Sequence, residues 1–295
     1  RAVLTKYAVK DTSITNKEAI SFTIQPTIVL GNYKLLRVQD LMVLDIVRSA
    51  NWERPVYFAM TVSDDSKVGL REFMQLEGLA FRLVPRKGPY WENLNEGLMR
   101  GHFFTNPEKR SKEPQIGFLW RGLRDSTVYY DEDVRRLMIN YRQAFLSLGY
   151  YYANVKKESP RFAEVLDRME EVMPRRIIRM PVGMKFDLAN YYGLAGRQDR
   201  SQELLREVAD ELTPIVGKRQ TPQVSEDNPY ILLLRAYEGL AMYKEAEDLL
   251  AVIREVYASE QGVEEFVKEQ GTRLRILRGS KDTLALQPSQ SAKGK

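Results

Sequence analysis

Four carboxylates in one short stretch are the residues of this sequence best suited to chemistry. Asp64, Asp65, Glu72 and Glu77 fall within residues 64–77. Paired carboxylates act as acid and base in glycoside hydrolysis, and carboxylate oxygens also bind hard cations such as Ca²⁺. Acidic residues in a strand-to-helix connection have a second use, because their oxygens cap the exposed N–H groups of the helix that follows. For Asp64 and Asp65 we favour capping over chemistry.

The same stretch is rich in aromatic residues that could stack on a sugar or a peptide. They are Trp52, Tyr57, Phe58, Phe73 and Phe81. Alternation along a strand places Tyr57 and Phe58 on opposite faces, so one of the two faces must be core.

Other kinds of catalytic site have little support in the sequence. Cysteine is absent, which excludes disulfides, thiol nucleophiles and zinc sites built on sulfur, and His102 is the single histidine. No glycine-rich phosphate loop, nucleophile elbow or metal-binding helix motif occurs. We therefore assign no catalytic residue, no metal ligand and no cofactor.

The composition indicates a globular protein. Of the 295 residues, 43% are hydrophobic and 29% charged, and the net charge of +5 is spread along the chain, which argues against nucleic-acid binding. No apolar run approaches the ~20 residues that cross a bilayer. The sequence starts at Arg1 rather than at a methionine, so we expect a fragment of a longer chain.

The carboxylates and aromatics should be positioned by a small α/β unit over residues 1–90. Residues 4–30 favour strands, and residues 37–50 form an amphipathic helix that Asn51 closes, with 41–47 as its buried face. A strand over 54–62, a helix over 67–78 capped by Gly78, and a strand over 79–84 follow. Residues 91–125 read as an irregular linker or docking segment.

Residues 126–278 are helical, and residues 279–295 form a polar tail that we expect to be disordered. Ala163, Ser201 and Ala246 occupy equivalent small-residue positions in three irregular copies of a tetratricopeptide-like helical hairpin. The fold class is thus mostly α, with tetratricopeptide-like hairpins after a small α/β unit; an ordinary helical bundle is the alternative. Tyr151, Tyr192 and Tyr230 are candidates for a concave binding face, although most tyrosines of such hairpins are core residues.

Two segments carry a resemblance to a known family. "DLMVLDIVRSANWERPVYFA" and "SDDSKVGLREFMQLEGLAFRLVP" resemble the soluble C-terminal region of a family of multi-pass bacterial membrane proteins of unassigned function, common in Bacteroidetes and their relatives. The likeness is strong over about residues 37–87, and Ser63 stands where family members often have glycine. The shared positions are Asn51, Trp52, Arg54, Pro55, Tyr57, Phe58, Gln75, Glu77, Gly78, Leu79, Arg82, Leu83, Val84 and Pro85.

That family looks related to membrane glycosyltransferases of the GT-C type and to a protein O-mannosyltransferase. The resemblance implies a non-catalytic accessory domain on the periplasmic face of the inner membrane, with the transferase chemistry in membrane segments outside this sequence. Such a domain would bind acceptor polypeptide or partner proteins through its helical hairpins, or a glycan, but no nucleic acid. The alternatives are a carbohydrate-active or metal-dependent enzyme using Asp64, Asp65 and Glu77, and a free-standing helical-repeat scaffold. The candidate binding residues are Trp52, Arg54, Tyr57, Asp64, Asp65, Gln75, Glu77, Tyr151, Tyr192 and Tyr230.

Overall fold

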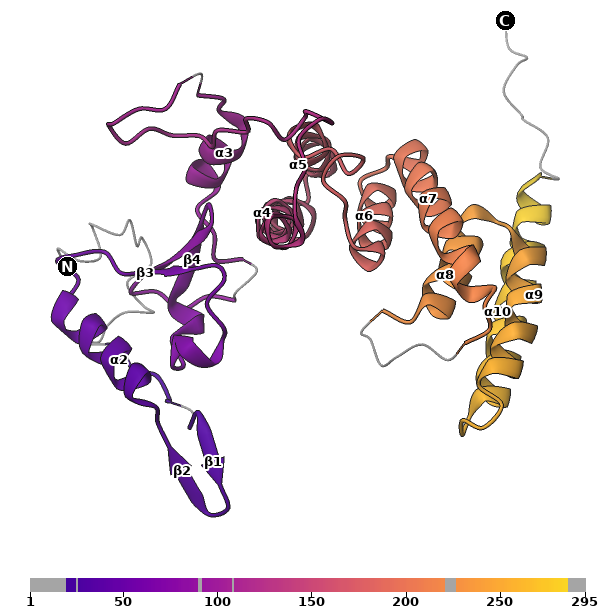
Figure 1. Ribbon diagram of the computed structural model, residues 1–295, viewed down its shortest axis with the longest axis horizontal. Coiled ribbons are helices and arrows are strands. Elements are labelled where there is room, and N and C mark those ends of the chain that lie inside the picture. Colours follow the sequence, from indigo (N-terminus) through magenta and orange to yellow (C-terminus); the bar gives the residue numbers. More distant parts are fainter. Residues whose placement is uncertain (1–19, 25, 90–91, 108, 221–226, 286–295) are drawn as a thin grey trace, which may run out of the picture. The chain divides into compact units, whose positions relative to one another are not determined.

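A computed structural model describes residues 20–24, 26–89, 92–107, 109–220 and 227–285 (Figure 1). The chain divides into two compact units, Arg1–Arg179 and Met180–Lys295. It is mostly helical with a small β unit near its N-terminal end, which confirms the predicted fold class.

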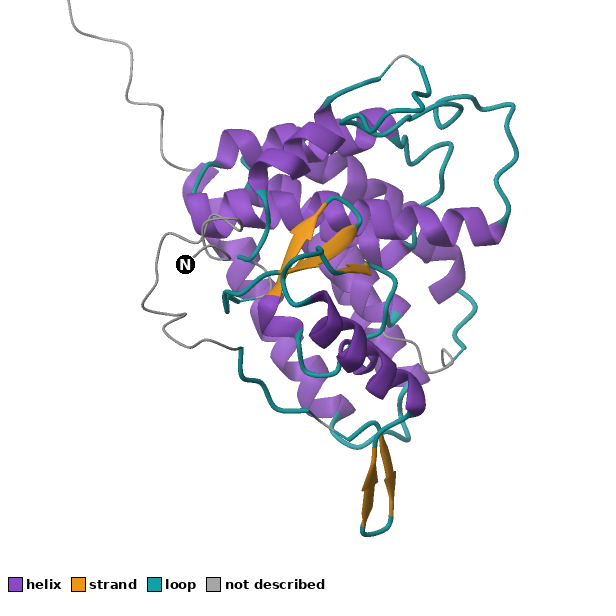
Figure 2. Cartoon of the chain, turned by 90° about the vertical axis from the view of Figure 1, so that its left-hand side faces the viewer, coloured by secondary structure: helices purple, strands orange, loops and turns teal. Residues whose placement is uncertain are grey.

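The first unit begins with an antiparallel hairpin of β1 (Ile28–Leu30) and β2 (Tyr33–Leu35). Gly31 makes the turn at a φ of +58°, a left-handed conformation that glycine adopts without strain. Of the strand character predicted over residues 4–30, Ile28–Leu30 is confirmed, and the described residues before Ile28 form no strand. Residues 4–19 of that prediction lie outside the described residues. Figures 1 and 2 both show the hairpin standing clear of the other elements.

Helix α2 (Val38–Ala50) follows the hairpin and ends at Asn51, as predicted. Asn51 has a φ of +44° and donates its backbone N–H to the carbonyl of Arg48, so it closes the helix in the left-handed conformation. The prediction that 41–47 is a buried face was wrong. Leu41, Met42 and Ile46 are more than half exposed, because the described part of the unit packs against only one side of α2.

A three-stranded antiparallel sheet contains Tyr57, Phe58, Glu77 and Phe81 of the stretch rich in carboxylates and aromatic residues. Its order is β3 (Tyr57–Ala59), β5 (Ala80–Leu83) and β4 (Met74–Glu77). Phe58 and Phe81 pair across the strands and are buried, whereas Tyr57 is half exposed, which confirms the predicted alternation.

The helix predicted over 67–78 is absent. Two 3₁₀ turns, η2 (Asp65–Lys67) and η3 (Arg71–Phe73), lead into β4 instead. Val68 and Gly69 both take positive φ values, +45° and +84°, which no α-helix accommodates. Gly78 is correspondingly no helix cap but part of the turn between β4 and β5, at a φ of +69°.

Residues 91–125 contain a helix that the sequence did not predict, α3 (Glu96–Phe104). It is short, and Gly97 and Gly101 lower its helix propensity. Asn95 caps it by accepting a hydrogen bond from the N–H of Leu98. The aromatic segment after it packs on the next helix, α4 (Glu132–Tyr150), where Trp120 lies 5.8 Å from Phe145, centroid to centroid.

The first unit ends with a helical pair. Helix α4 continues into a π-helical turn, η4 (Tyr151–Lys156), and α5 (Ser159–Val172) packs back against α4. The second unit consists of α6 (Val182–Leu194), α7 (Gln198–Val216), α8 (Pro229–Leu240), α9 (Tyr243–Val256) and α10 (Val263–Ala285).

Consecutive helices of the second unit pack on one another, so the region after the α/β unit is built from helical hairpins. Ser201 and Ala246, two of the three predicted small-residue positions, are buried between helices, and Ala163 in the first unit is half-buried. Helix α10 reaches Ala285, seven residues beyond Arg278, where the helical pattern of the sequence fades. The rest of the predicted tail lies outside the described residues.

Candidate functional site

The C-terminal end of α2 borders a cleft of about 380 Å³. Its walls come from the segment before the hairpin, from α2, from the turn that connects α2 to β3, and from β5. The lining residues are Ile20, Phe22, Leu44, Val47, Arg48, Ala50, Asn51, Trp52, Arg54, Val56 and Leu83. The structure thus brings two of the predicted binding residues, Trp52 and Arg54, into one cavity, which we call the Trp52 cleft.

Trp52 reaches the cleft through an unusual backbone conformation. It has a φ of +60°, directly after Asn51 at +44°. A bulky residue rarely adopts a positive φ, and such conformations persist where the surrounding structure imposes them, often at functional sites. Here the N–H groups of Glu53 and Arg54 both donate to the carbonyl of Ala50 and hold the tight turn.

Gly69 fixes the opposite wall of the cleft. A Cβ at this position would lie 2.3 Å from the carbonyl oxygen of Thr23, so only glycine lets the segment 20–24 run this close. The neighbouring Phe22 packs edge-on against Phe73 at 6.5 Å. Sequence reasoning missed this wall, because the contact joins positions far apart in the chain.

The Trp52 cleft has apolar walls, and two arginine side chains lie at its edge. Seven of its lining residues are aliphatic or aromatic apart from Ala50, and Arg48 and Arg54 are exposed at its edge. Arg48 donates to Asp45 at 2.7 Å, in a pair whose two side chains are largely exposed. Pockets with apolar walls and a few polar groups bind apolar ligands and orient them by the polar groups. This cleft suits an apolar segment that carries a negative charge.

A second group of predicted residues meets on one face of the sheet. The register aligns Tyr57, Arg82 and Gln75 across β3, β5 and β4, and Glu77 lies two residues further along β4, on the same face. The hydroxyl of Tyr57 donates to Oε2 of Glu77 at 3.1 Å, and Nδ2 of Asn95 donates to its Oε1 at 3.2 Å.

Glu77 therefore acts as the centre of a polar network. Its side chain is 5% exposed, and the guanidinium of Arg82 lies 3.7 Å from Oε1. Both carboxylate oxygens are engaged by neighbours, which favours a positioning role over a role as acid or base. Asn95 was missed from the sequence because it lies beyond the sheet; its position as the cap of α3 is the signal that could have found it.

Asp64 belongs to a separate network, whereas its neighbour Asp65 begins η2. Asp64 accepts from Nζ of Lys67 at 2.7 Å and from Arg71 at 2.6 Å, and the hydrogen bond with Lys67 lowers the pKa of Asp64. Asp64 precedes η2 but its side chain makes no capping hydrogen bond, so the predicted capping role was wrong. No helix follows that Asp64 could cap, and its carboxylate pairs with cations instead.

The carboxylates do not form a metal site within the part of the chain that the structure describes. No group of three or more His, Asp or Glu residues there could hold a metal ion. The partners of Glu77 are Tyr57, Asn95 and Arg82, whereas Asp64 pairs with Lys67 and Arg71.

The three candidate tyrosines of the helical region have different environments. Tyr151 is half-buried in η4, with Nζ of Lys156 5.6 Å from its ring centroid. Tyr192 and Tyr230 are each 1% exposed, and the hydroxyl of Tyr230 donates to the carbonyl of Gln220. Their burial makes Tyr192 and Tyr230 core residues that present no ring to a ligand in this structure.

One comparison with known proteins bears on this site. Residues 3–97 match the family model of TMEM260-associated domain 2. The matched region covers about a third of the chain and contains the hairpin, α2, the sheet and the Trp52 cleft, whereas α4 to α10 lie beyond it. Neither the curated proteins nor the solved structures give a match. Among the described residues, none of the helices combines the length and the apolar character needed to cross a bilayer.

Proposed function

We propose that this chain is a non-catalytic accessory domain of a glycosyltransferase-like membrane protein, and that it binds a polypeptide on the extracytoplasmic side. The bound polypeptide is an acceptor or a partner protein. The match to TMEM260-associated domain 2 and the motif resemblance over residues 37–87 support the association with a membrane protein. The helical hairpins, which we interpret as tetratricopeptide-like, extend the domain beyond the matched region.

The Trp52 cleft is the observation that carries the binding function. Its volume of about 380 Å³ holds a few apolar side chains, which is the scale of a short peptide anchor rather than of a whole domain. Tryptophan and arginine are the residues that most often dominate the energy of binding interfaces. We therefore assign the ligand as an extended segment with apolar side chains in the cleft and a carboxylate against Arg54.

The test is a titration of the full chain against fluorescent peptides that pair two or three apolar residues with one acidic residue. We expect binding that falls about tenfold or more in Trp52→Asn, because asparagine tolerates the left-handed backbone but removes the ring. Arg54→Glu should weaken binding of the acidic peptides and spare their amide analogues. Tyr129→Ala, at an exposed residue that does not line the cleft, is the matched control.

Two results would overturn the assignment. One is peptide affinity that Trp52→Asn and Arg54→Glu leave unchanged. The other is turnover of a glycoside or nucleotide sugar by the purified chain that disappears in Glu77→Gln, since this would make Glu77 catalytic.

A further inference from the structure

The β1–β2 hairpin exposes an apolar surface that nothing described covers. Val29 and Leu30 are each 62% exposed and Tyr33 is 73% exposed. The register pairs Ile28 with Leu35 and Leu30 with Tyr33, so these four side chains share one face. Val29 and Lys34 occupy the other face. A solvated hairpin normally places polar residues on at least one of its faces.

Helix α2 continues this surface at the base of the hairpin. Val38, Leu41 and Met42 are each more than half exposed and lie within its first turns. Val38 and Met42 lie on the side of the helix opposite Val47, which lines the Trp52 cleft, and Leu41 lies between the two sides. The helix is thus apolar on two sides, and only one of them has a partner within the described residues. Monomeric soluble proteins rarely leave so large an apolar surface in water.

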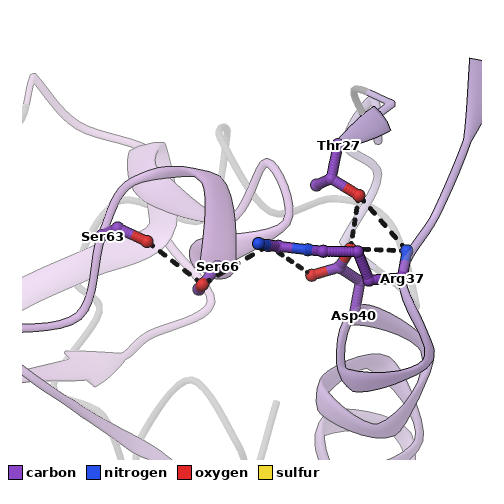
Figure 3. Close-up of polar contacts among 5 residues, drawn as sticks. All are labelled: Thr27, Arg37, Asp40, Ser63 and Ser66. Atoms are coloured by element: carbon purple, nitrogen blue, oxygen red, sulfur yellow. Dashed lines mark hydrogen bonds and ion pairs between the residues drawn. The ribbon is translucent and has the colours of Figure 1, made fainter. Parts of the chain in front are cut away.

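An ion pair with a buried carboxylate makes the hairpin and α2 a single platform (Figure 3). Asp40 accepts from the hydroxyl of Thr27 at 2.6 Å and from the backbone and guanidinium of Arg37. Arg37 also donates to Ser66 of η2 at 3.4 Å, and Ser66 contacts Ser63. These bonds tie the hairpin base to the start of α2 and to the body of the unit, so the exposed surface is held in place rather than free to fold back.

The charges of this platform are few and basic. Within residues 26–44 the charged side chains are Lys34, Arg37 and Asp40, and Asp40 is buried against Arg37. Lys34 therefore gives the exposed surface of the platform a net positive charge. The next acidic residue, Asp45, is paired with Arg48.

We propose that the hairpin, together with the first turns of α2, docks in the interface of an anionic lipid bilayer. Leu30 and Tyr33 would enter the headgroup region, where the amphipathic ring of tyrosine is favoured, and Lys34 would face anionic headgroups. The hairpin projects from the unit and has apolar groups on both faces, so its partner must be able to surround it. A fluid lipid bilayer can adapt its shape in this way. A second copy of the chain is less suited, because strands of three residues offer few bonds for edge pairing. This inference does not depend on peptide binding in the Trp52 cleft.

Cosedimentation of the full chain with vesicles tests the proposal. We expect the chain to pellet with vesicles of phosphatidylcholine and phosphatidylglycerol. The double variant Leu30→Asp/Tyr33→Asp should lose at least about tenfold in partition, because two large apolar side chains no longer enter the interface. Lys34→Glu should weaken binding to the anionic vesicles and leave binding to pure phosphatidylcholine unchanged.

The matched control is Leu194→Asp/Tyr129→Asp, which makes the same kind of change at exposed residues elsewhere. Near-ultraviolet circular dichroism of all variants verifies that they are folded. The proposal is overturned if the native chain stays in the supernatant, or if the hairpin variant pellets as the native chain does. Self-association in sedimentation velocity that the hairpin variant abolishes, without any vesicle binding, would assign the surface to a second copy instead.

Discussion

At the scale of single residues, Asp40 has the largest structural consequence. Its hydrogen bond from Arg37 and the further bond from Thr27 hold the pKa of Asp40 well below its ordinary value of 3.8, against the burial that raises it. A carboxyl whose pKa is lower in the folded state stabilises the fold at pH values above its unfolded pKa. That stabilisation is lost as the pH falls below about 4 towards the folded pKa.

Asp40→Asn is therefore expected to lower the free energy of unfolding at pH 6 and to matter less in acid. Urea unfolding of both chains at pH 6 and at pH 3 measures the difference, which should narrow at the lower pH. Asp45→Asn is the control, because an exposed pair such as Asp45 and Arg48 contributes only about 0–1 kcal/mol. Equal stability of Asp40→Asn and the native chain at pH 6 would refute the role of Asp40.

Arg142 is the other residue with a large expected effect. It is fully buried, and it donates to the carbonyls of Met173, Ile178 and Arg179, which fixes the chain after α5 to α4. Burial lowers the pKa of Arg142 to about 10, so the side chain stays charged at neutral pH.

Arg142→Leu should destabilise the first unit by roughly 3 kcal/mol, since buried carbonyls left without a donor cost about 1–3 kcal/mol each. Thermal and urea unfolding measure the loss. The control is Arg136→Leu on the same helix, whose side chain is 70% exposed and which should change stability by less than about 0.5 kcal/mol. A loss of the same size in both variants would show that Arg142 acts only through helix propensity.

At the scale of elements, close packing of helices depends on particular glycines. A Cβ at Gly149 in α4 would lie 2.9 Å from the ring of Phe162 in α5, so the two helices approach closely at this point. A Cβ at Gly271 in α10 would meet Leu250 at 3.9 Å, which is an ordinary contact.

Gly149→Ala and Gly271→Ala should consequently have opposite effects. Overpacking at Gly149 is expected to cost about 1–3 kcal/mol, less the gain in helix propensity. Gly271→Ala should stabilise by about 0.5–1 kcal/mol, because alanine restricts the unfolded chain and favours the helix. Urea unfolding measures both, and a stabilising Gly149→Ala would contradict the close approach of α4 and α5.

The elements also show what the sequence could and could not predict. The spacing of apolar residues and the capping residues were enough to predict α2 with its end at Asn51, β5, and the helices after residue 131. They failed over 67–78, where a helix was predicted but Val68 and Gly69 adopt positive φ. A single sequence does not reveal that Gly69 lies against Thr23, and such long-range contacts decide the local conformation.

The candidate site was predictable in part for the same reason. The motif resemblance singled out Trp52, Arg54, Tyr57, Gln75 and Glu77. In the structure these residues lie in two places. The turn after α2 brings Trp52 and Arg54 into the Trp52 cleft, whereas the strand register places Tyr57, Gln75 and Glu77 on one face of the sheet. Which side of α2 is buried depends on what packs against it, and the apolar pattern of a helix with two apolar sides does not distinguish them.

At the scale of the whole molecule, the chain divides into two compact units. Each unit has its own buried core, with Phe145 and Leu148 in the first and Leu234 and Leu188 in the second. Units with separate cores unfold in separate steps when the contacts between them contribute little.

Scanning calorimetry is expected to resolve two transitions. Leu234→Ala, at a fully buried residue of α8, should shift the transition of the second unit alone, with a loss of about 2–5 kcal/mol. Leu148→Ala should do the same to the first unit. One transition that both variants shift equally would show that the two units unfold together.

The central claim is that the Trp52 cleft binds polypeptide, and methyl-resolved NMR of the full chain during a peptide titration tests it most directly. We predict that the shifts concentrate on the methyl groups of Leu44, Val47, Val56 and Leu83 and on the indole of Trp52, all of which line the cleft. They should vanish in Trp52→Asn. Shifts confined to α6–α10, with the cleft methyl groups unchanged, would contradict the claim and assign peptide binding to the helical hairpins.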